Sequence, residues 1–80
     1  MKLLVGTTPV RIPGDRARPV IQNLGPGTVY VDTDGDVSAD DGLVLLPNAV
    51  YEFPTPSANS KGIWVVADQA GTDVRVVRMG

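Results

Sequence analysis

The fold of this chain is decided by NLGPGTVYVD at residues 23–32, by the acidic segment TDGDVSADDG at 33–42 and by the apolar run LVLL at 43–46. Residues 28–32 alternate polar and apolar side chains, which is the period of a half-buried strand. The GPG triplet at 25–27 combines a fixed proline φ with two glycines that tolerate positive φ. The pattern predicts a strand, a tight turn, a second strand, a long loop and a third strand. We expect the first two strands to form an antiparallel hairpin.

The remaining apolar segments are also short, and turn-forming residues separate them. No segment shows a helical period. We expect residues 43–46 and 49–53 to form a pair joined by Pro47-Asn48, and residues 63–67 and 72–79 to form a closing antiparallel pair. About seven short strands spaced by glycine and proline are typical of an all-β fold. We therefore predict a compact antiparallel β-sandwich or small barrel, and favour the sandwich.

Composition excludes several classes of function. The chain has 80 residues, which is one domain, with seven prolines, nine glycines and neither cysteine nor histidine. A disulfide framework and a thiolate metal site are therefore excluded, and the commonest general base is missing. The net charge of −2 does not suit nucleic acid, because phosphate binding needs a clustered basic surface. We expect no nucleic-acid partner and no enzymatic activity.

The N-terminal segment, residues 1–17, alternates only weakly and is broken at Gly6 and Pro9. We expect it to be an extended arm, or a broken strand, that adds to a neighbouring subunit. Met1–Val5 is too short an apolar run for a signal peptide or a membrane span, so we expect the mature chain to begin at Met1 and to have no membrane partner.

The acidic loop is the strongest metal-like signal. Asp32, Asp34 and Asp36 match positions one, three and five of an EF-hand loop, but Val37 occupies the glycine position and Leu43 replaces the glutamate at position twelve. These aspartates are weak candidates for a calcium site of another type. The other interpretation is a soluble turn region, because Asp-Gly pairs favour turns. On that interpretation the loop carboxylates are exposed, and no cofactor is bound.

Arginines and tyrosines are the candidates for partner binding. Arg11, Arg16 and Arg18 either form a basic contact patch or pair with acidic groups of the same protein. The strand period places Tyr30 and Tyr51 away from the valine face, where they are either interface anchors or core residues. Trp64 lies in the most apolar strand, and we expect it in the core.

Residues 19–53 resemble the small virion proteins of tailed bacteriophages, namely capsid decoration and head-fibre proteins. The resemblance rests on the I-x-N-L-G-x-G-x-V-Y-V pattern, a loop with glycine and aspartate, Val37-Ser38, then Gly42-Leu43-x-Leu45 and Pro47. It implies a short all-β domain that assembles as an oligomer, with a trimer favoured, on the major capsid protein. It also implies location on the capsid surface after synthesis in the host cytoplasm.

Two functions are therefore expected. The first is a structural virion protein that binds and stabilises the outer shell as a decoration protein. A β domain of this length without disulfides gains stability from oligomerisation or attachment to a lattice, which agrees with this function. The alternative is a small β-sandwich module that binds calcium through the acidic loop or carbohydrate through exposed tyrosines.

Overall fold

The structure is a computed structural model, and it describes residues 1–12, 18–33, 35–38, 40–53 and 62–79. Pro13-Gly14-Asp15, a sequence typical of a turn, lies outside these residues, and so does most of the polar segment 54–62, which the sequence indicates to be a loop. The described part contains eight strands: β1 (Lys2–Val5), β2 (Val10–Ile12), β3 (Arg18–Gly25), β4 (Val29–Asp32), β5 (Leu43–Leu45), β6 (Val50–Glu52), β7 (Ile63–Ala67) and β8 (Thr72–Met79). It contains no helix long and apolar enough to cross a membrane.

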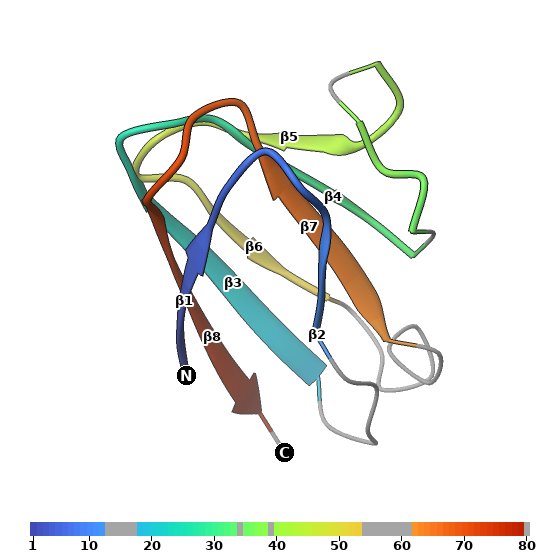
Figure 1. Ribbon diagram of the computed structural model, residues 1–80. Helices are drawn as coiled ribbons and strands as arrows, with labels where there is room; N and C mark the ends of the chain where they lie inside the picture. Colours follow the sequence, from blue (N-terminus) through green and yellow to red (C-terminus); the bar gives the residue numbers. More distant parts are fainter. Residues whose placement is uncertain (13–17, 34, 39, 54–61, 80) are drawn as a thin grey trace.

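The strands form two antiparallel sheets, one in the order β1-β8-β3-β6 and the other in the order β2-β7-β4-β5 (Figure 1). Four of the pairings are nested: β1 pairs with β8, β2 with β7, β3 with β6 and β4 with β5. The two halves of the chain therefore form one long ribbon that winds into two layers. This strand order is that of a jelly roll, a double-sheet sandwich. The prediction of an all-β sandwich is confirmed.

The core lies between the two sheets and is made by the inward face of each strand. Val29 and Val31 on β4 face inward, as the period of two predicts, and Val74 and Val76 do so on β8. The core cluster consists of Val5, Ile12, Ile21, Val29, Val31, Leu45, Phe53, Ile63, Val65, Ala67, Val74 and Val76. Because both sheets contribute to this one cluster, neither sheet buries its apolar face without the other.

The segment 23–32 is not the hairpin that its sequence predicts. β3 belongs to the first sheet and β4 to the second, so the GPG triplet carries the chain across the sandwich. Gly27 packs so closely that a Cβ there would lie 2.6 Å from Oγ1 of Thr72. Gly25 has φ of 85°, a left-handed conformation that favours glycine. The turn residues were identified correctly, but they turn the chain between layers.

The same correction applies to two other predicted pairs. β5 and β6 lie in different sheets, and so do β7 and β8. Of the consecutive strands, β4 and β5 share a sheet, and the acidic loop connects them. The acidic loop is therefore the tip of the wound ribbon.

The N-terminal segment, as far as the structure describes it, is not an extended arm. β1 pairs with β8 and β2 pairs with β7 of the same chain. Val5 and Ile12 are fully buried in the core cluster. The weak alternation of residues 1–12 arises because β1 and β2 are edge strands of different sheets, each too short to show a clear period.

Candidate surface for partner binding

β5 and the residue after it carry three of the eight large apolar side chains that are exposed in the described chain. β5 is an edge strand, and Leu43, Val44 and Leu46 are 52%, 56% and 61% exposed. We call β5 together with Leu46 the β5 edge. Natural edge strands are commonly protected by charged residues or proline. Residues 43–46 contain neither, and Pro47 follows the run. An unprotected edge of this kind can accept an added strand.

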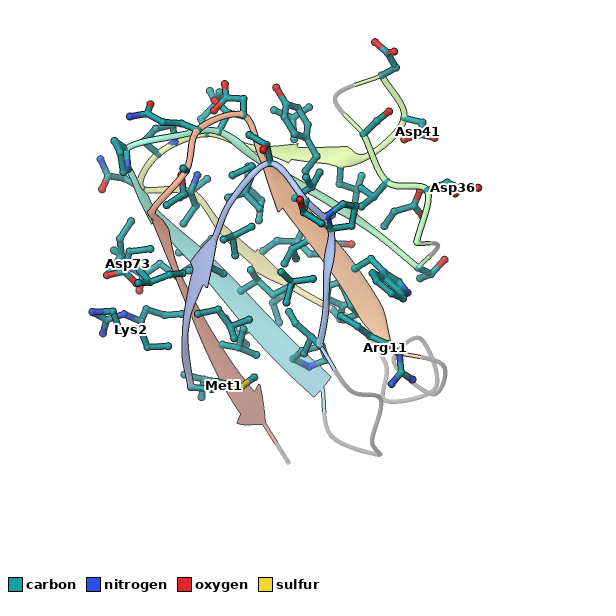
Figure 2. All side chains as sticks on the ribbon, in the orientation of Figure 1. Met1, Lys2, Arg11, Asp36, Asp41 and Asp73 are labelled. Atoms are coloured by element: carbon teal, nitrogen blue, oxygen red, sulfur yellow. The ribbon has the colours of Figure 1, made fainter. Side chains whose placement is uncertain are left out.

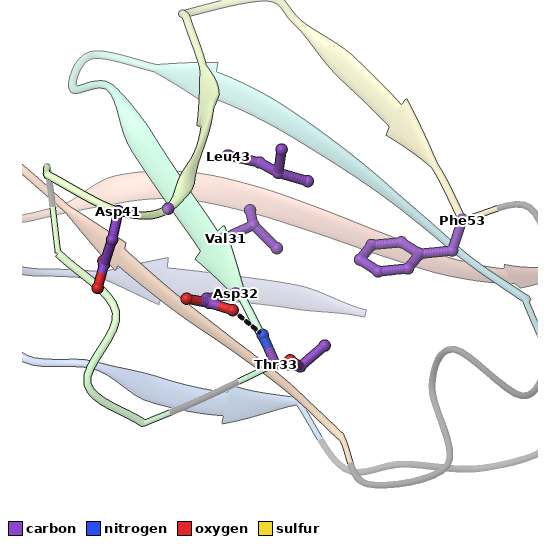
Figure 3. Close-up of a pocket in the computed structure, with 7 residues that line it drawn as sticks. Val31, Asp32, Thr33, Asp41, Leu43 and Phe53 are labelled. Carbon is purple, nitrogen blue, oxygen red and sulfur yellow. Dashed lines mark hydrogen bonds between the residues drawn. The ribbon is translucent and has the colours of Figure 1, made fainter.

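A cavity of about 300 Å³ opens beside the β5 edge. Val31, Leu43 and Phe53 line it together with Asp32, Thr33, Asp41 and Gly42, and the three apolar side chains point toward one another in Figure 3. Val31 and Leu43 are paired across β4 and β5, while Phe53 follows β6 in the other sheet. The cavity therefore lies where the two sheets separate along their β5 and β6 edges. Its volume is at the lower end of that of small-molecule sites, which suits one inserted side chain.

The acidic loop is held by its own polar groups. The amide and the hydroxyl of Ser38 both donate to Oδ1 of Asp41, at 3.0 and 3.2 Å. In return, the amides of Asp41 and Gly42 donate to the carbonyl of Ser38. Val37 is buried, and its Cγ2 lies 3.0 Å from where a Cβ on Gly42 would be. The loop thus closes on itself at Ser38 and Asp41, and it is anchored by one apolar side chain.

The three calcium candidates do not form a ligand set in the described residues. Asp32 ends β4, and its Oδ1 accepts a hydrogen bond from the amide of Thr33 at 2.6 Å. Asp36 is exposed, and Asp34 lies outside the described residues. Among the residues that the structure describes, no three acidic side chains gather where they could hold a metal ion. Asp36, Asp40 and Asp41 are exposed, as predicted.

The structure separates the residues predicted to bind a partner. Arg11 on β2 and Tyr30 on β4 lie on the outer face of the second sheet, with β7 between them. Arg18 belongs to β3 in the other sheet, so Tyr30 and Arg18 do not lie on one sheet face. Arg16 lies outside the described residues, and nothing is described of the Arg18 side chain. Arg11 is exposed and Tyr30 is half-buried.

Tyr51 faces the core side, contrary to the expectation from its strand period. It is opposite the fully buried Ile21, and its ring meets that of Phe53 edge to face at 4.9 Å. Successive residues from 50 to 53 do lie on alternate faces, as a period of two predicts. The inward face carries the aromatic residues because Val50, although apolar, lies on the exposed side of an edge strand.

Trp64 lies on the outer face of the second sheet and not in the core. Ile63 and Val65 of β7 belong to the core cluster, and Trp64 alternates with them. Its cross-strand neighbours are Arg11 on β2 and Asp32 on β4. Gly35 packs against the indole, so that a Cβ on Gly35 would lie 3.3 Å from the ring. The acidic loop therefore covers part of this outer face.

Three charged side chains, those of Lys2, Asp73 and Arg75, interact on the outer face of the first sheet. The guanidinium of Arg75 donates to both oxygens of Asp73, and Nζ of Lys2 is 4.0 Å from the same carboxylate. The hydrogen bond from Arg75 is the main reason why the pKa of Asp73 is lowered. Figure 2 shows Lys2 and Asp73 on the opposite side of the molecule from Asp36 and Asp41. This group is therefore separate from the β5 edge.

The sequence missed the β5 edge and its cavity. The run LVLL predicts a strand, but which strand becomes an edge depends on pairing between distant segments. The short length of the LVLL run and its lack of charged residues were the signals of an unprotected edge strand. No family model matches this chain, and no curated protein or solved structure matches it.

Proposed function

We propose that this chain is a structural virion protein, a capsid decoration protein that binds the outer shell formed by the major capsid protein. The observation that carries the proposal is the β5 edge, an exposed apolar strand beside a cavity. Contiguous exposed apolar surface marks a site of protein association. The chain acts without a catalytic step, as a homo-oligomer, with a trimer favoured, on the capsid surface.

Two further observations support the proposal. The pattern in residues 19–53 resembles that of small phage virion proteins, and the jelly roll is an architecture used in viral capsid domains. The second observation is an analogy at the level of the fold, and the same architecture also serves lectins. The β5 edge favours attachment to a protein surface, since sugar sites are lined by polar and aromatic groups.

The test is the composition of virus particles from the natural source of the chain. We expect mass spectrometry of purified particles to detect the chain, and antibodies against it to label the outside of intact particles. Adding the purified chain to particles depleted of it should raise the temperature at which the shell opens. A chain that is abundant in the lysate and absent from purified particles contradicts the proposal.

The alternative is a binding module for calcium or carbohydrate. It is favoured by Trp64 and Tyr30 on one outer face and by the acidic loop beside them. A calcium module gains thermal stability with added calcium and loses it with chelator, because binding stabilises the folded state by mass action. We expect the melting temperature to be the same in both conditions.

A further inference from the structure

We infer that the β5 edge binds an extended segment of the partner protein as an additional antiparallel strand, with one apolar side chain in the adjacent cavity and a basic residue at its C-terminal end. This inference deepens the proposed function and rests on it for the identity of the partner. It adds the chemistry and the direction of the bound segment. Strand addition to a sheet edge is a common mode of peptide recognition.

β5 is paired with β4 on one side and ends the sheet on the other. Every strand pair in the sandwich is antiparallel, so an antiparallel addition continues the pattern of the sheet. The added strand would cover Leu43 and Val44, which are more than half exposed.

Side chains of an added strand alternate between the two faces of the sheet. Those on the inner face, alongside Leu43, point into the space between Leu43 and Phe53. Val31 and Phe53, two of the residues that line this space, belong to the core cluster, so the space reaches the core of the sandwich. An apolar side chain from the partner would therefore extend the core of the sandwich.

Asp40 and Asp41 are exposed directly before β5, whereas residues 46–50 after it carry no charge. In an antiparallel pair, the C-terminal end of the added strand lies beside the N-terminal end of β5. A lysine or arginine at that end meets the two carboxylates. The charge distribution therefore fixes the direction of the bound segment as well as its chemistry.

A second copy of the chain is a poorer occupant. Antiparallel pairing of two β5 strands centred on Val44 places Asp41 opposite Pro47 and Asp40 opposite Asn48, so neither carboxylate meets a basic residue. The acidic end of each copy would remain without an opposite charge. A basic segment of another protein satisfies both the apolar edge and the carboxylates.

The test uses two labelled peptides of identical composition and the full chain. Both alternate threonine and valine, and they carry two lysines either at the C-terminal or at the N-terminal end. Fluorescence anisotropy at low salt should show at least about threefold tighter binding of the peptide with C-terminal lysines, a difference that salt reduces. Equal binding, a preference for N-terminal lysines or no binding of either peptide overturns the inference.

Two variants with matched controls locate the site. Val44→Lys should abolish binding of both peptides, because a charge on an edge strand blocks strand addition. Val77→Lys, at a similarly exposed position on β8, should leave binding unchanged. Asp40→Asn with Asp41→Asn should remove the preference between the peptides, and Asp73→Asn should keep it. Thermal melting of each variant establishes that it is folded, and any folded variant with the opposite pattern contradicts the inference.

The same variants distinguish this inference from the proposed function. If the chain is found on particles and both Val44→Lys and Val77→Lys still bind there, the inference fails and the decoration function stands. If the peptides bind with the expected direction and the chain is absent from particles, the inference stands with a different partner. A stable dimer in which Val44→Lys restores the monomer shows that a second copy occupies the edge, which also overturns the inference.

Discussion

Asn23 lies fully buried at the corner where β3 leaves one sheet and the chain passes to β4 in the other. Its Nδ2 donates to the carbonyls of Gly27 and Leu45, and its Oδ1 accepts from the amide of Gly25. Buried polar side chains are retained where they satisfy backbone groups that have left the regular ladder. Asn23 therefore joins three segments of the chain at one point.

We predict that Asn23→Ala destabilises the chain severely. It leaves three buried backbone groups without their partner, and each such group costs about 1 to 3 kcal/mol. A chain of this length has a total stability of roughly 4 to 12 kcal/mol, so a loss of about 3 kcal/mol or more is a large part of it. Urea unfolding measures the change. Gln22→Ala, on the outer face of the same strand, should change stability by about 0.5 kcal/mol at most.

Trp64 shows the limit of reading burial from an apolar run. All five residues of β7 are apolar, so the sequence offers no polar residue to mark the outward face. Ile63 and Val65 are fully buried and alternate with Trp64, so Trp64 lies on the outward face of β7. The acidic loop then covers the outer side partly, which is why this strand is apolar on both faces.

The second prediction compares the two faces of β7. Ile63→Ala should cost about 2 to 5 kcal/mol, the usual range for a buried isoleucine. Trp64→Ala should cost less than Ile63→Ala, because the indole is only half-buried. Chemical denaturation of both variants decides between the faces. A greater loss of stability for Trp64→Ala than for Ile63→Ala would mean that Trp64 belongs to the core.

At the scale of elements, the sequence predicted where strands occur better than how they pair. Alternation and turn residues act over a few neighbours, and they located the strands from β3 to β8, whereas β1 and β2 were expected as an arm or one broken strand. Pairing depends on which distant segments meet, and three adjacent pairs expected as hairpins cross between the sheets instead. The GPG triplet illustrates the reason, because a glycine-proline turn reverses the chain equally well within a sheet or between two. The close packing of Gly27 against Thr72 is visible only in the fold.

The third prediction tests whether β1 belongs to the sandwich. Val5→Ala removes two methyl groups from the core and should destabilise the isolated chain by about 1.5 kcal/mol. Leu4→Ala, on the neighbouring residue that is 68% exposed, should change stability by about 0.5 kcal/mol at most. Melting of both variants by circular dichroism makes the comparison. Equal and small effects would mean that β1 is an arm without a role in the folded chain.

At one end of the sandwich, backbone hydrogen bonds join the segments that connect the two sheets to one another. The amide of Ala67 donates to the carbonyl of Gly6, the amide of Asp68 to the carbonyl of Thr28, and the amide of Asn48 to the carbonyl of Asn23. The β5 edge runs along one side of the sandwich, toward the acidic loop, and remains open. A sandwich with an open apolar edge is suited to attachment to a larger surface. The oligomer-forming function was expected from a resemblance and stays a proposal, and the sequence did not indicate the β5 edge.

The most direct test of attachment through the β5 edge is a cryo-electron microscopy map of purified particles, at a resolution that traces strands. We predict a two-layered sandwich on the outside of the shell, with β5 next to an extended segment of the major capsid protein and the β1-β8-β3-β6 sheet facing away from the contact. A sandwich that contacts the shell through the outer face of that sheet, with β5 exposed to solvent, would contradict it.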